Sequence, residues 1–567
     1  MSNHLKYFFN RSFELLHYKT FDSYRVSLHN PITIFEELYE ALENYDKKKI
    51  KHFDPTITDI GEEALSFLKN EYINEIVIFG DFSKKQILNL FEKECVKSKK
   101  DSKKRSLSLI SKAIIENNRN FKEILFDRII ELLLSQDDID YVKLDNYISW
   151  LITQMLHDGF SRKYLERRFR RGGDEVFKNI NKPKKALENL KDKCLSQKRE
   201  YEVIFKINDS GSNKLKITDE RIKQIGSLPL KVKRSQYINE SFKTLSKTEE
   251  FFQVDLKARD FWSAIFQANI IICEFIEMNT LGDSERSFIK ENQAICIYKN
   301  NGKTLLRMDT ITEQIDGFYE YNEIAFNRFV ENYVSIKSTT AKEKISSAIR
   351  FYKLGDESVE LEHKILNYWI GFEQLFSSIG TKEDSIKRMK SFFIKLNCIY
   401  YLQRRTNYLI SRFEKIDTKP DQKGFEVGDL THELEKKIKH EDLIITNPLN
   451  KSRLLKYLDM LGSNQSMKKI LESHKNRLNQ HLTRVYSVRN QIAHEGSSHV
   501  NLTLISGHLR HYLVFSIEQI TNELNENSTL DHLDDVFIYY ENIYDRIMEC
   551  NNIQEVFSVK DYQGYME

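Results

Sequence analysis

The sequence predicts a mainly α-helical protein with a small α+β module between two helical regions. Proline and glycine are scarce, with 6 and 19 in 567 residues, so few positions interrupt a helix. Apolar residues recur at spacings of three and four over most of the chain, which is the period of an amphipathic helix. Between about residues 200 and 308 the pattern changes to alternating apolar and polar residues, which indicates β-strands.

The composition indicates a folded protein that acts away from membranes. Hydrophobic residues make up 40% of the chain and charged residues 30%. The net charge is only +3, so any contact with RNA must come from local basic patches. The six cysteines form no CxxC pair, which argues against a zinc ribbon or a disulfide scaffold and fits a reducing cytosol. No signal-peptide layout begins the sequence, and no uncharged apolar run approaches the roughly 18 residues of a membrane span. We therefore expect a cytoplasmic protein with no membrane partner.

The change of pattern divides the chain into four predicted segments. A chain of this length suffices for about three or four domains. The segments are an N-terminal mostly helical region (1–195), a small α+β module (196–335), a helical bundle (336–550) and a C-terminal tail (551–567). No catalytic constellation falls in the α+β module, so a scaffold or sensing role is expected for it.

In the N-terminal region, helical periodicity extends from residue 32 to about 190, for example over 129–134 and 148–155. The short apolar run Ile76–Asp81 is consistent with either a buried strand or a helix end.

Two basic clusters stand out in the same region. The first, from Lys97 to Arg105, has low complexity and is typical of a solvated loop. The second, from Arg162 to Arg171, precedes Gly172 and Gly173 and covers too much of a helix circumference to form one stripe. A helix C-terminus, where the dipole favours cations, is the expected place for it, and contact with RNA or a partner is the alternative.

The middle module combines strands with one helix. Residues 201–207, 251–256, 294–298 and 304–308 are rich in β-branched and aromatic residues or alternate in polarity, and predict strands. A turn at Asn300-Asn301-Gly302 joins the last two. A helix is predicted from Phe261 to Phe275, and strands with an intervening helix indicate an α+β module.

The C-terminal bundle is predicted to contain four main helices. The first runs from Leu361 to Ser378 and the second from Ile386 to Phe413. A polar segment from Thr418 to His440 then looks like an inserted loop. The third helix carries the apolar residues of 478–492, and the fourth those of 502–520.

The third helix also contains Arg489-Asn490-Gln491-Ile492-Ala493-His494, whose ends suit RNA cleavage without a metal. Arginine is a permanent cation whose planar fork of donors fits a phosphate, and histidine exchanges a proton near neutral pH. The spacing alone is weak evidence, because with 15 His in the chain a His follows any Arg at a chosen offset about once in 38 cases. Arg11 and His17 form such a near-match, which we discard because it has a longer spacer and no polar residue of the Asn490 kind.

At about 100° per residue, Arg489 falls inside the apolar stripe that contains Leu482, Val485 and Ile492. A guanidinium in such a place requires a partner. Two interpretations remain open. One is a structural ion pair with a neighbouring helix, for which Glu373 is the candidate, and the other is a groove where an RNA phosphate completes the pair.

His494 lies five residues after Arg489, or about 140° around an ideal helix, so one unbroken helix does not bring the two together. Gly496 predicts a helix stop, which places His494 in the last turn, where the chain can bend. A helix C-terminus favours the imidazolium that donates a proton to a leaving oxygen, although an ordinary capping or surface histidine is the alternative. Asn490 offers both a donor and an acceptor to a ribose or phosphate oxygen.

These residues resemble a HEPN domain of the Apea-like branch. The resemblance covers about 200 residues. It consists of the aromatic helix 366–376 with its Glu373, the Arg489-Asn490-x-x-x-His494 motif, and the apolar helix that follows. It implies a four-helix domain that forms a two-fold homodimer and places two motif copies across one cleft.

The resemblance also implies a metal-independent endoribonuclease, often a toxin or antiviral effector, with no cofactor. On that interpretation, His494 is the general acid or base when the 2′-hydroxyl attacks the phosphate, and Arg489 stabilises the phosphorane. Asn490 orients the phosphate or the His, and Glu373 holds Arg489 or His494 in place. The products would be a 2′,3′-cyclic phosphate and a 5′-hydroxyl.

Two other interpretations of the sequence remain open. The first is a non-catalytic HEPN module that binds RNA or a partner protein. The second is a toxin held inactive by a partner or by its own N-terminal region until a trigger, such as a phage-derived one, releases it. No P-loop and no clustered carboxylate signature occurs in the sequence, which disfavours a phosphotransferase and a metal-dependent nuclease.

Overall fold

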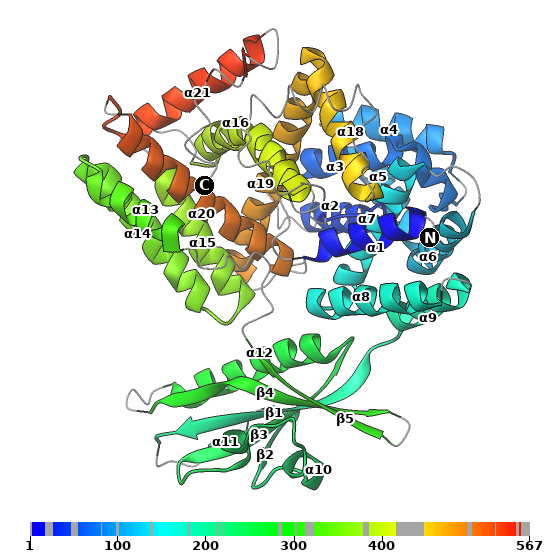
Figure 1. Ribbon diagram of the computed structural model, residues 1–567, viewed down its shortest axis with the longest axis vertical. Coiled ribbons are helices and arrows are strands. Elements are labelled where there is room, and N and C mark those ends of the chain that lie inside the picture. The colour runs from blue at the N-terminus through cyan, green and yellow to red at the C-terminus, as the bar shows by residue number, and fades with distance from the viewer. Residues whose placement is uncertain are drawn as a thin grey trace. The chain divides into compact units, whose positions relative to one another are not determined.

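The computed structural model confirms that the fold is mainly helical, with one small antiparallel sheet (Figure 1). The chain forms two compact units, which we call the helical unit (residues 1–150 and 317–567) and the sheet unit (residues 151–316). The structure describes residues 3–17, 27–46, 55–80, 82–97, 101–135, 140–179, 182–211, 215–217, 219–281, 286–300, 303–311, 323–377, 385–414, 447–495, 502–527, 529–550, 555–556 and 559. The predicted loop 418–440 and most of the predicted tail 551–567 lie outside these residues.

The two units differ from the predicted segments in how they group the chain. The N-terminal helices share one unit with the C-terminal bundle, whereas the helices between residues 151 and 316 belong with the sheet. Sequence periodicity could not reveal this grouping, because it depends on contacts between residues hundreds of positions apart.

The sheet unit is built on five strands in the order β2-β3-β1-β4-β5, and every neighbouring pair is antiparallel. The strands are β1 (Arg199–Asp209), β2 (Ile222–Ile225), β3 (Glu249–Ala258), β4 (Phe288–Asn300) and β5 (Lys303–Thr310). The four predicted strands are therefore confirmed as β1, β3, β4 and β5. The short edge strand β2 was missed, because Ile-Lys-Gln-Ile is too brief to show a period.

Helix α12 (Phe261–Thr280) covers one face of the sheet (Figure 1), as its predicted apolar pattern requires. It begins with a capping box in which the Asp260 carboxylate accepts from the backbone N–H of Ser263 while the Ser263 hydroxyl accepts from Asp260. Among the described helices, α12 is the one long and apolar enough to cross a membrane by length and composition. Its packing against the sheet accounts for that apolar character.

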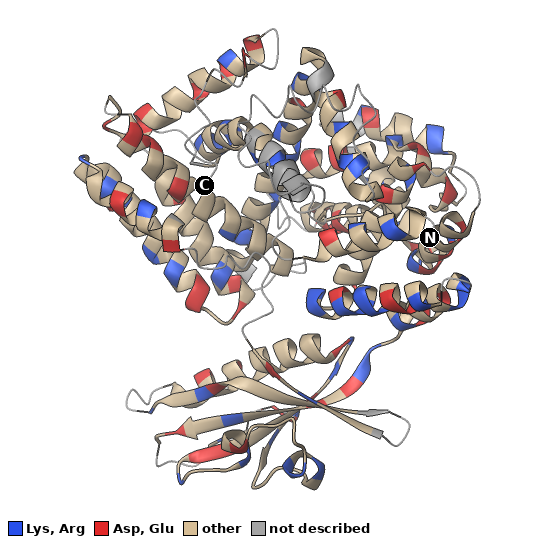
Figure 2. Ribbon diagram, in the orientation of Figure 1, with Lys and Arg blue, Asp and Glu red and all other residues tan. Residues whose placement is uncertain are grey.

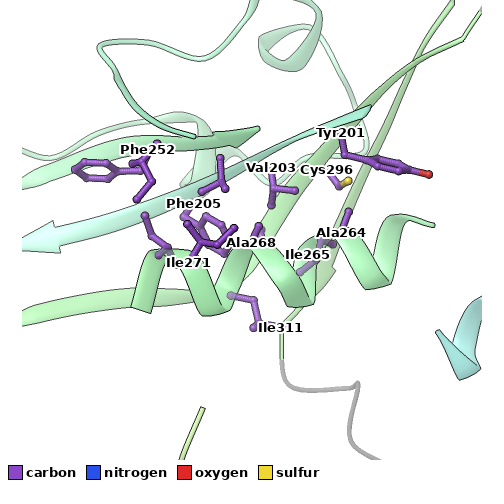
Figure 3. Close-up of a cluster of buried hydrophobic side chains, with 14 of the residues drawn as sticks. Tyr201, Val203, Phe205, Phe252, Ala264, Ile265, Ala268, Ile271, Cys296 and Ile311 are labelled. Carbon is purple, nitrogen blue, oxygen red and sulfur yellow. The ribbon is translucent and has the colours of Figure 1, made fainter. Parts of the chain in front are cut away.

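The core between α12 and the sheet is formed by alternate residues of three strands (Figure 3). Phe205 of β1 is fully buried there, with Ala268 and Ile271 of α12 in the same cluster. The opposite face is covered by the segment that contains α10 (Leu230–Lys233) and α11 (Glu240–Lys243), through Val232 and Phe242.

Replacing Phe205 by Ala is expected to lower the free energy of unfolding of the sheet unit by about 3–5 kcal/mol, because it leaves a cavity in this core. Urea unfolding followed by circular dichroism measures the change. Replacing the exposed Leu305 by Ala is the control, and an equal loss in both variants would contradict this description of the core.

The sheet unit also contains α8 (Arg162–Lys178), α9 (Pro183–Leu195) and the end of α7 (Tyr141–His157), a helix that begins in the helical unit. The basic cluster 162–171 begins α8, so the prediction that it ends a helix is wrong. Gly172 and Gly173 lie inside the helix. A Cβ on Gly172 would stand 3.1 Å from Leu190 of α9, so the small residue permits close helix packing rather than ending α8.

The N-terminal part of the helical unit consists of short helices. They are α1 (Asn3–Leu16), α2 (Thr33–Asp46), α3 (Pro55–Lys69), α4 (Lys84–Lys97), α5 (Asp101–Asn117), α6 (Phe121–Leu134) and α7 (Tyr141–His157). The loop predicted at 97–105 is wrong for residues 101–105, which are helical. Helix α5 is held in the core by the buried side chains of Leu107, Ile110 and Ile114, and its first turns include the end of the basic run.

The apolar run at residues 76–81 is neither a strand nor a helix over its described residues. It follows the short 3₁₀ helix η2 (Glu71–Glu75). The Asn118 side chain accepts from the N–H of Ile78 and donates to its carbonyl, at 2.8 Å each, and so satisfies this backbone in place of a strand.

The C-terminal part of the helical unit contains the predicted bundle. Its helices are α13 (Glu323–Ser335), α14 (Thr339–Glu357), α15 (Leu361–Phe376), α16 (Ser385–Glu414), α18 (Pro448–Gly462), α19 (Asn464–Glu495), α20 (Leu502–Glu526) and α21 (Leu533–Glu549). The four predicted helices correspond to α15, α16, α19 and α20. Helix α15 packs against α14, α19 and α20, which brings Glu373 and the motif into neighbouring helices.

Candidate active site

The motif lies at the end of α19, a helix of 32 residues. The helix ends at Glu495, so His494 occupies its last turn, as expected from Gly496, which itself lies outside the described residues. The helix is regular through the whole motif. The bend that would bring Arg489 and His494 together within one chain is therefore absent up to Glu495, and the two side chains leave the helix about 140° apart.

Arg489 is half-buried, and one edge of its guanidinium is satisfied locally. Its Nη1 donates to Oδ1 of Asn490 at 3.0 Å, so these two predicted site residues are in contact. Its Nε is buried and has no acceptor among the described residues. A buried donor without an acceptor typically costs about 1–3 kcal/mol. A ligand whose acceptor atom reached this Nε would remove that cost.

A second buried donor lies one helix away. Tyr486, one turn before Arg489, contacts the ring of Trp369 on α15, with centroids 5.6 Å apart. Trp369 is fully buried, and its Nε1 also has no acceptor among the described residues. Tyr486 escaped the sequence analysis, although its spacing of three from Arg489 places both on adjoining parts of one helix face.

Glu373 is half-buried on α15, one turn after Trp369. Within the described part of the chain, Arg489 and Glu373 form no ion pair, and the hydrogen bond of Arg489 goes to Asn490 instead. The structure thus brings Arg489 and Asn490 together and places Glu373 on the adjacent helix. His494 is exposed on another side of α19.

Two N-terminal helices hold α19 through a buried ion network. Arg484, one and a half turns before Arg489, donates to both carboxylate oxygens of Glu37 on α2 at 2.7 and 2.8 Å. It also donates to Glu63 on α3 at 2.7 Å. Burial opposes the charge on Arg484, but the two carboxylates outweigh it and raise the pKa of the guanidinium above its ordinary value. Residues more than 400 positions earlier in the chain therefore hold the motif helix in place.

A similar network explains the near-match at Arg11. Arg11 donates to Glu14 and to Asp145, each at 2.6 Å, and Arg453 of α18 donates to Glu14 at 2.8 Å. Burial opposes ionisation of Asp145, but Arg11 and Arg453 hold the pKa of that carboxyl below its usual range. Arg11 is thus a structural residue.

Two other histidines, His481 of α19 and His508 of α20, are in contact between these helices. His481 Nε2 lies 3.0 Å from Nδ1 of His508, and the Tyr512 hydroxyl lies 3.2 Å from His481 Nδ1. His481 is buried, and the two imidazoles share one hydrogen bond, so they serve packing between the helices better than acid–base chemistry on a substrate.

No group of three or more His, Cys, Asp or Glu side chains that could hold a metal occurs among the residues that the structure describes. Comparison of the chain with protein-family models, with curated proteins and with solved structures finds no match. The function must therefore be argued from the residues of the site.

Proposed function

We propose that this protein is a metal-independent endoribonuclease of the HEPN type that cleaves RNA through Arg489 and His494, as a regulated toxin or antiphage effector. The observation that supports this most is the half-buried guanidinium of Arg489, whose Nε lacks an acceptor among the described residues. A phosphate oxygen is the acceptor that such a fork fits best. Asn490, already bonded to Arg489, would align the fork toward the phosphate.

The chemistry needs one proton to be taken from the 2′-hydroxyl and one to be given to the leaving 5′-oxygen. A neutral imidazole removes the proton of the 2′-hydroxyl, and the O2′ atom forms a bond to phosphorus. Arg489 stabilises the charge of the phosphorane. The bond to the 5′-oxygen then breaks, and an imidazolium gives that oxygen its proton. One His494 per site can serve both roles, because the proton that its neutral imidazole takes in the first step is the one that its imidazolium gives in the second.

The geometry of α19 supports a site shared between two subunits. Because Arg489 and His494 diverge by about 140° on a regular helix, a group from each of two chains can face one phosphate where a single chain cannot. We therefore propose that the protein acts as a homodimer in which Arg489 of one protomer serves the same site as His494 of its partner.

Mixing the two inactive variants is expected to restore part of the activity. If Arg489→Ala and His494→Ala chains exchange freely, half of the dimers are mixed, and each mixed dimer has one intact site of two. Cleavage should therefore return to about one quarter of the wild-type rate, measured on total RNA. No recovery, despite exchange shown by differently tagged chains, would contradict a shared site.

A non-catalytic module that binds RNA or a partner protein is the second candidate. It is favoured by the exposure of His494 and by the absence, among the described residues, of a hydrogen bond that would orient its imidazole. The test is cleavage of total RNA in EDTA by the wild type and by the Arg489→Ala and His494→Ala variants. Cleavage that both variants lose supports the enzyme, and cleavage that either retains contradicts the assigned site.

A further inference from the structure

The basic residues of α8 form a surface that the proposed catalytic site does not use. On a helix, Lys163, Arg167, Arg170 and Arg171 fall within about 100° of one another, so four of the cluster's basic residues share one stripe. Along the axis, successive members stand about 6, 4.5 and 1.5 Å apart. The last three are exposed, and Figure 2 shows Lys and Arg gathered along this helix.

The stripe continues onto the sheet through one tryptophan. The ring of Trp262, at the start of α12, lies 5.7 Å from Lys163 Nζ and 4.8 Å from the Arg167 guanidinium. Arg307 of β5 stacks on the same ring at 3.9 Å. Cations from a helix and a strand therefore converge on one aromatic ring, whose quadrupole attracts them.

The positive charge at this place exceeds the negative charge that faces it. Asp309 accepts from Lys163 at 3.2 Å, from Arg307 at 3.0 Å and from Trp262 Nε1 at 3.0 Å. One carboxylate is thus paired directly with two cations, Lys163 and Arg307, while a third, Arg167, lies over the same tryptophan ring. Burial and the nearby Arg307 lower the pKa of Arg167 from its ordinary value, and burial does the same for Lys163 despite Asp309. Glu166, 3.5 Å from Arg170, and Asp174, farther along the stripe, are further carboxylates on the same helix.

The position of Lys163 in the first turn of α8 adds to this imbalance. Cations at the start of a helix oppose its dipole. Asp260 offsets part of that effect, since it accepts from the backbone N–H of Ser161 at 2.8 Å and from its hydroxyl at 2.7 Å. These bonds also fix the start of α8 against the start of α12, and with it the backbone that carries the stripe.

We infer that the α8 stripe and Arg307 bind the phosphate backbone of single-stranded RNA, as a second RNA contact apart from Arg489 and His494. A row of fixed, mainly arginine cations suits a chain of phosphates. Trp262 is only 3% exposed and covered by cations, so it cannot stack on a base, and binding is expected to be independent of sequence. A lipid surface is disfavoured, because the apolar residues of α8, such as Leu165 and Phe169, are buried rather than displayed beside the stripe.

The test uses the full chain and a short fluorescein-labelled 2′-O-methyl oligouridine, which cannot be cleaved because its 2′-oxygen carries no proton. Failure of this inference is thereby separated from failure of the proposed catalysis. The variant is Arg170→Glu with Arg171→Glu, and the matched control is Lys184→Glu with Lys185→Glu, which are exposed on α9 and change the net charge equally.

Fluorescence anisotropy should show that the α8 variant weakens binding at least about 10-fold at about 0.1 M salt. The slope of log K against log salt should fall by about 1.4, since each of two lost phosphate contacts contributes about 0.7. The control should bind like the wild type, and oligoadenosine like oligouridine. Absence of binding by the wild type, or equal binding by all three proteins, would overturn the inference. So would equal weakening in both variants, or stronger binding to vesicles of phosphatidylcholine and phosphatidylserine in equal parts.

Discussion

Replacing His494 by Ala is expected to lower RNA cleavage by about 10²–10⁴-fold, which is the usual contribution of a positioned general acid or base. Replacing Arg489 by Ala should lower it by about 10²–10³-fold, because the phosphorane then loses a charged donor. The rate is measured on a defined RNA under single-turnover conditions. Since His494 is exposed, its loss should leave the thermal unfolding midpoint unchanged.

Matched controls separate chemistry from a general loss of charge. Arg477 is an exposed arginine on the same helix as Arg489, and His363 is an exposed histidine on α15. Their alanine variants should cleave like the wild type. Cleavage within about threefold of wild type by either the Arg489 or the His494 variant would contradict the assignment of that residue.

Replacing Arg484 by Ala is expected to lower the free energy of unfolding of the helical unit by about 3–5 kcal/mol. The substitution leaves the partly buried carboxylates of Glu37 and Glu63 without the buried guanidinium that pairs with both, and removing one partner from a buried ion network has effects of this size. Urea unfolding measures the loss, and Arg477→Ala, on the same helix but exposed, should change it by no more than about 0.5 kcal/mol.

A triple variant shows whether the loss comes from the two carboxylates. Arg484→Met combined with Glu37→Gln and Glu63→Gln removes all three charges, and replacing a whole buried ion group by less polar side chains is often close to neutral. It should recover at least half of the stability that Arg484→Ala loses. A triple variant less stable than Arg484→Ala would contradict this view of the network.

The parts of the fold that sequence could predict are those that depend on local patterns. The strand at 201–207 alternates along its own length, and the helix from Phe261 shows its apolar spacing, so β1 and α12 follow from a few neighbouring residues. The grouping of the helical unit could not be predicted, because Arg484 and Glu37 are 447 positions apart and nothing near either residue indicates the other. The position of the second basic cluster, residues 162–171, was predicted wrongly for a related reason. Its charges pointed to a helix end, whereas Asp309 and Trp262, far along the chain, stabilise it at a helix start.

For the candidate site too, sequence could predict some features and not others. The place of His494 in a last helical turn follows from Gly496. The hydrogen bond between Arg489 and Asn490 was not predicted, because Asn490 was expected to face a phosphate, a ribose or the histidine. The buried, acceptor-free Nε of Arg489 required the structure, because it depends on how α15 packs on α19. The regularity of α19 up to Glu495 also required it, and this regularity is what makes a second subunit necessary for the proposed chemistry.

The most direct test of the proposed enzyme is the chemistry of the RNA ends it leaves in EDTA. Purified wild-type protein is incubated with a defined RNA in excess EDTA, and the products are analysed by mass spectrometry. The account predicts fragments with a 2′,3′-cyclic phosphate and a 5′-hydroxyl, formed by the wild type and by neither the Arg489→Ala nor the His494→Ala variant. Cleavage that needs a divalent metal, or that leaves a 3′-hydroxyl and a 5′-phosphate, would contradict it.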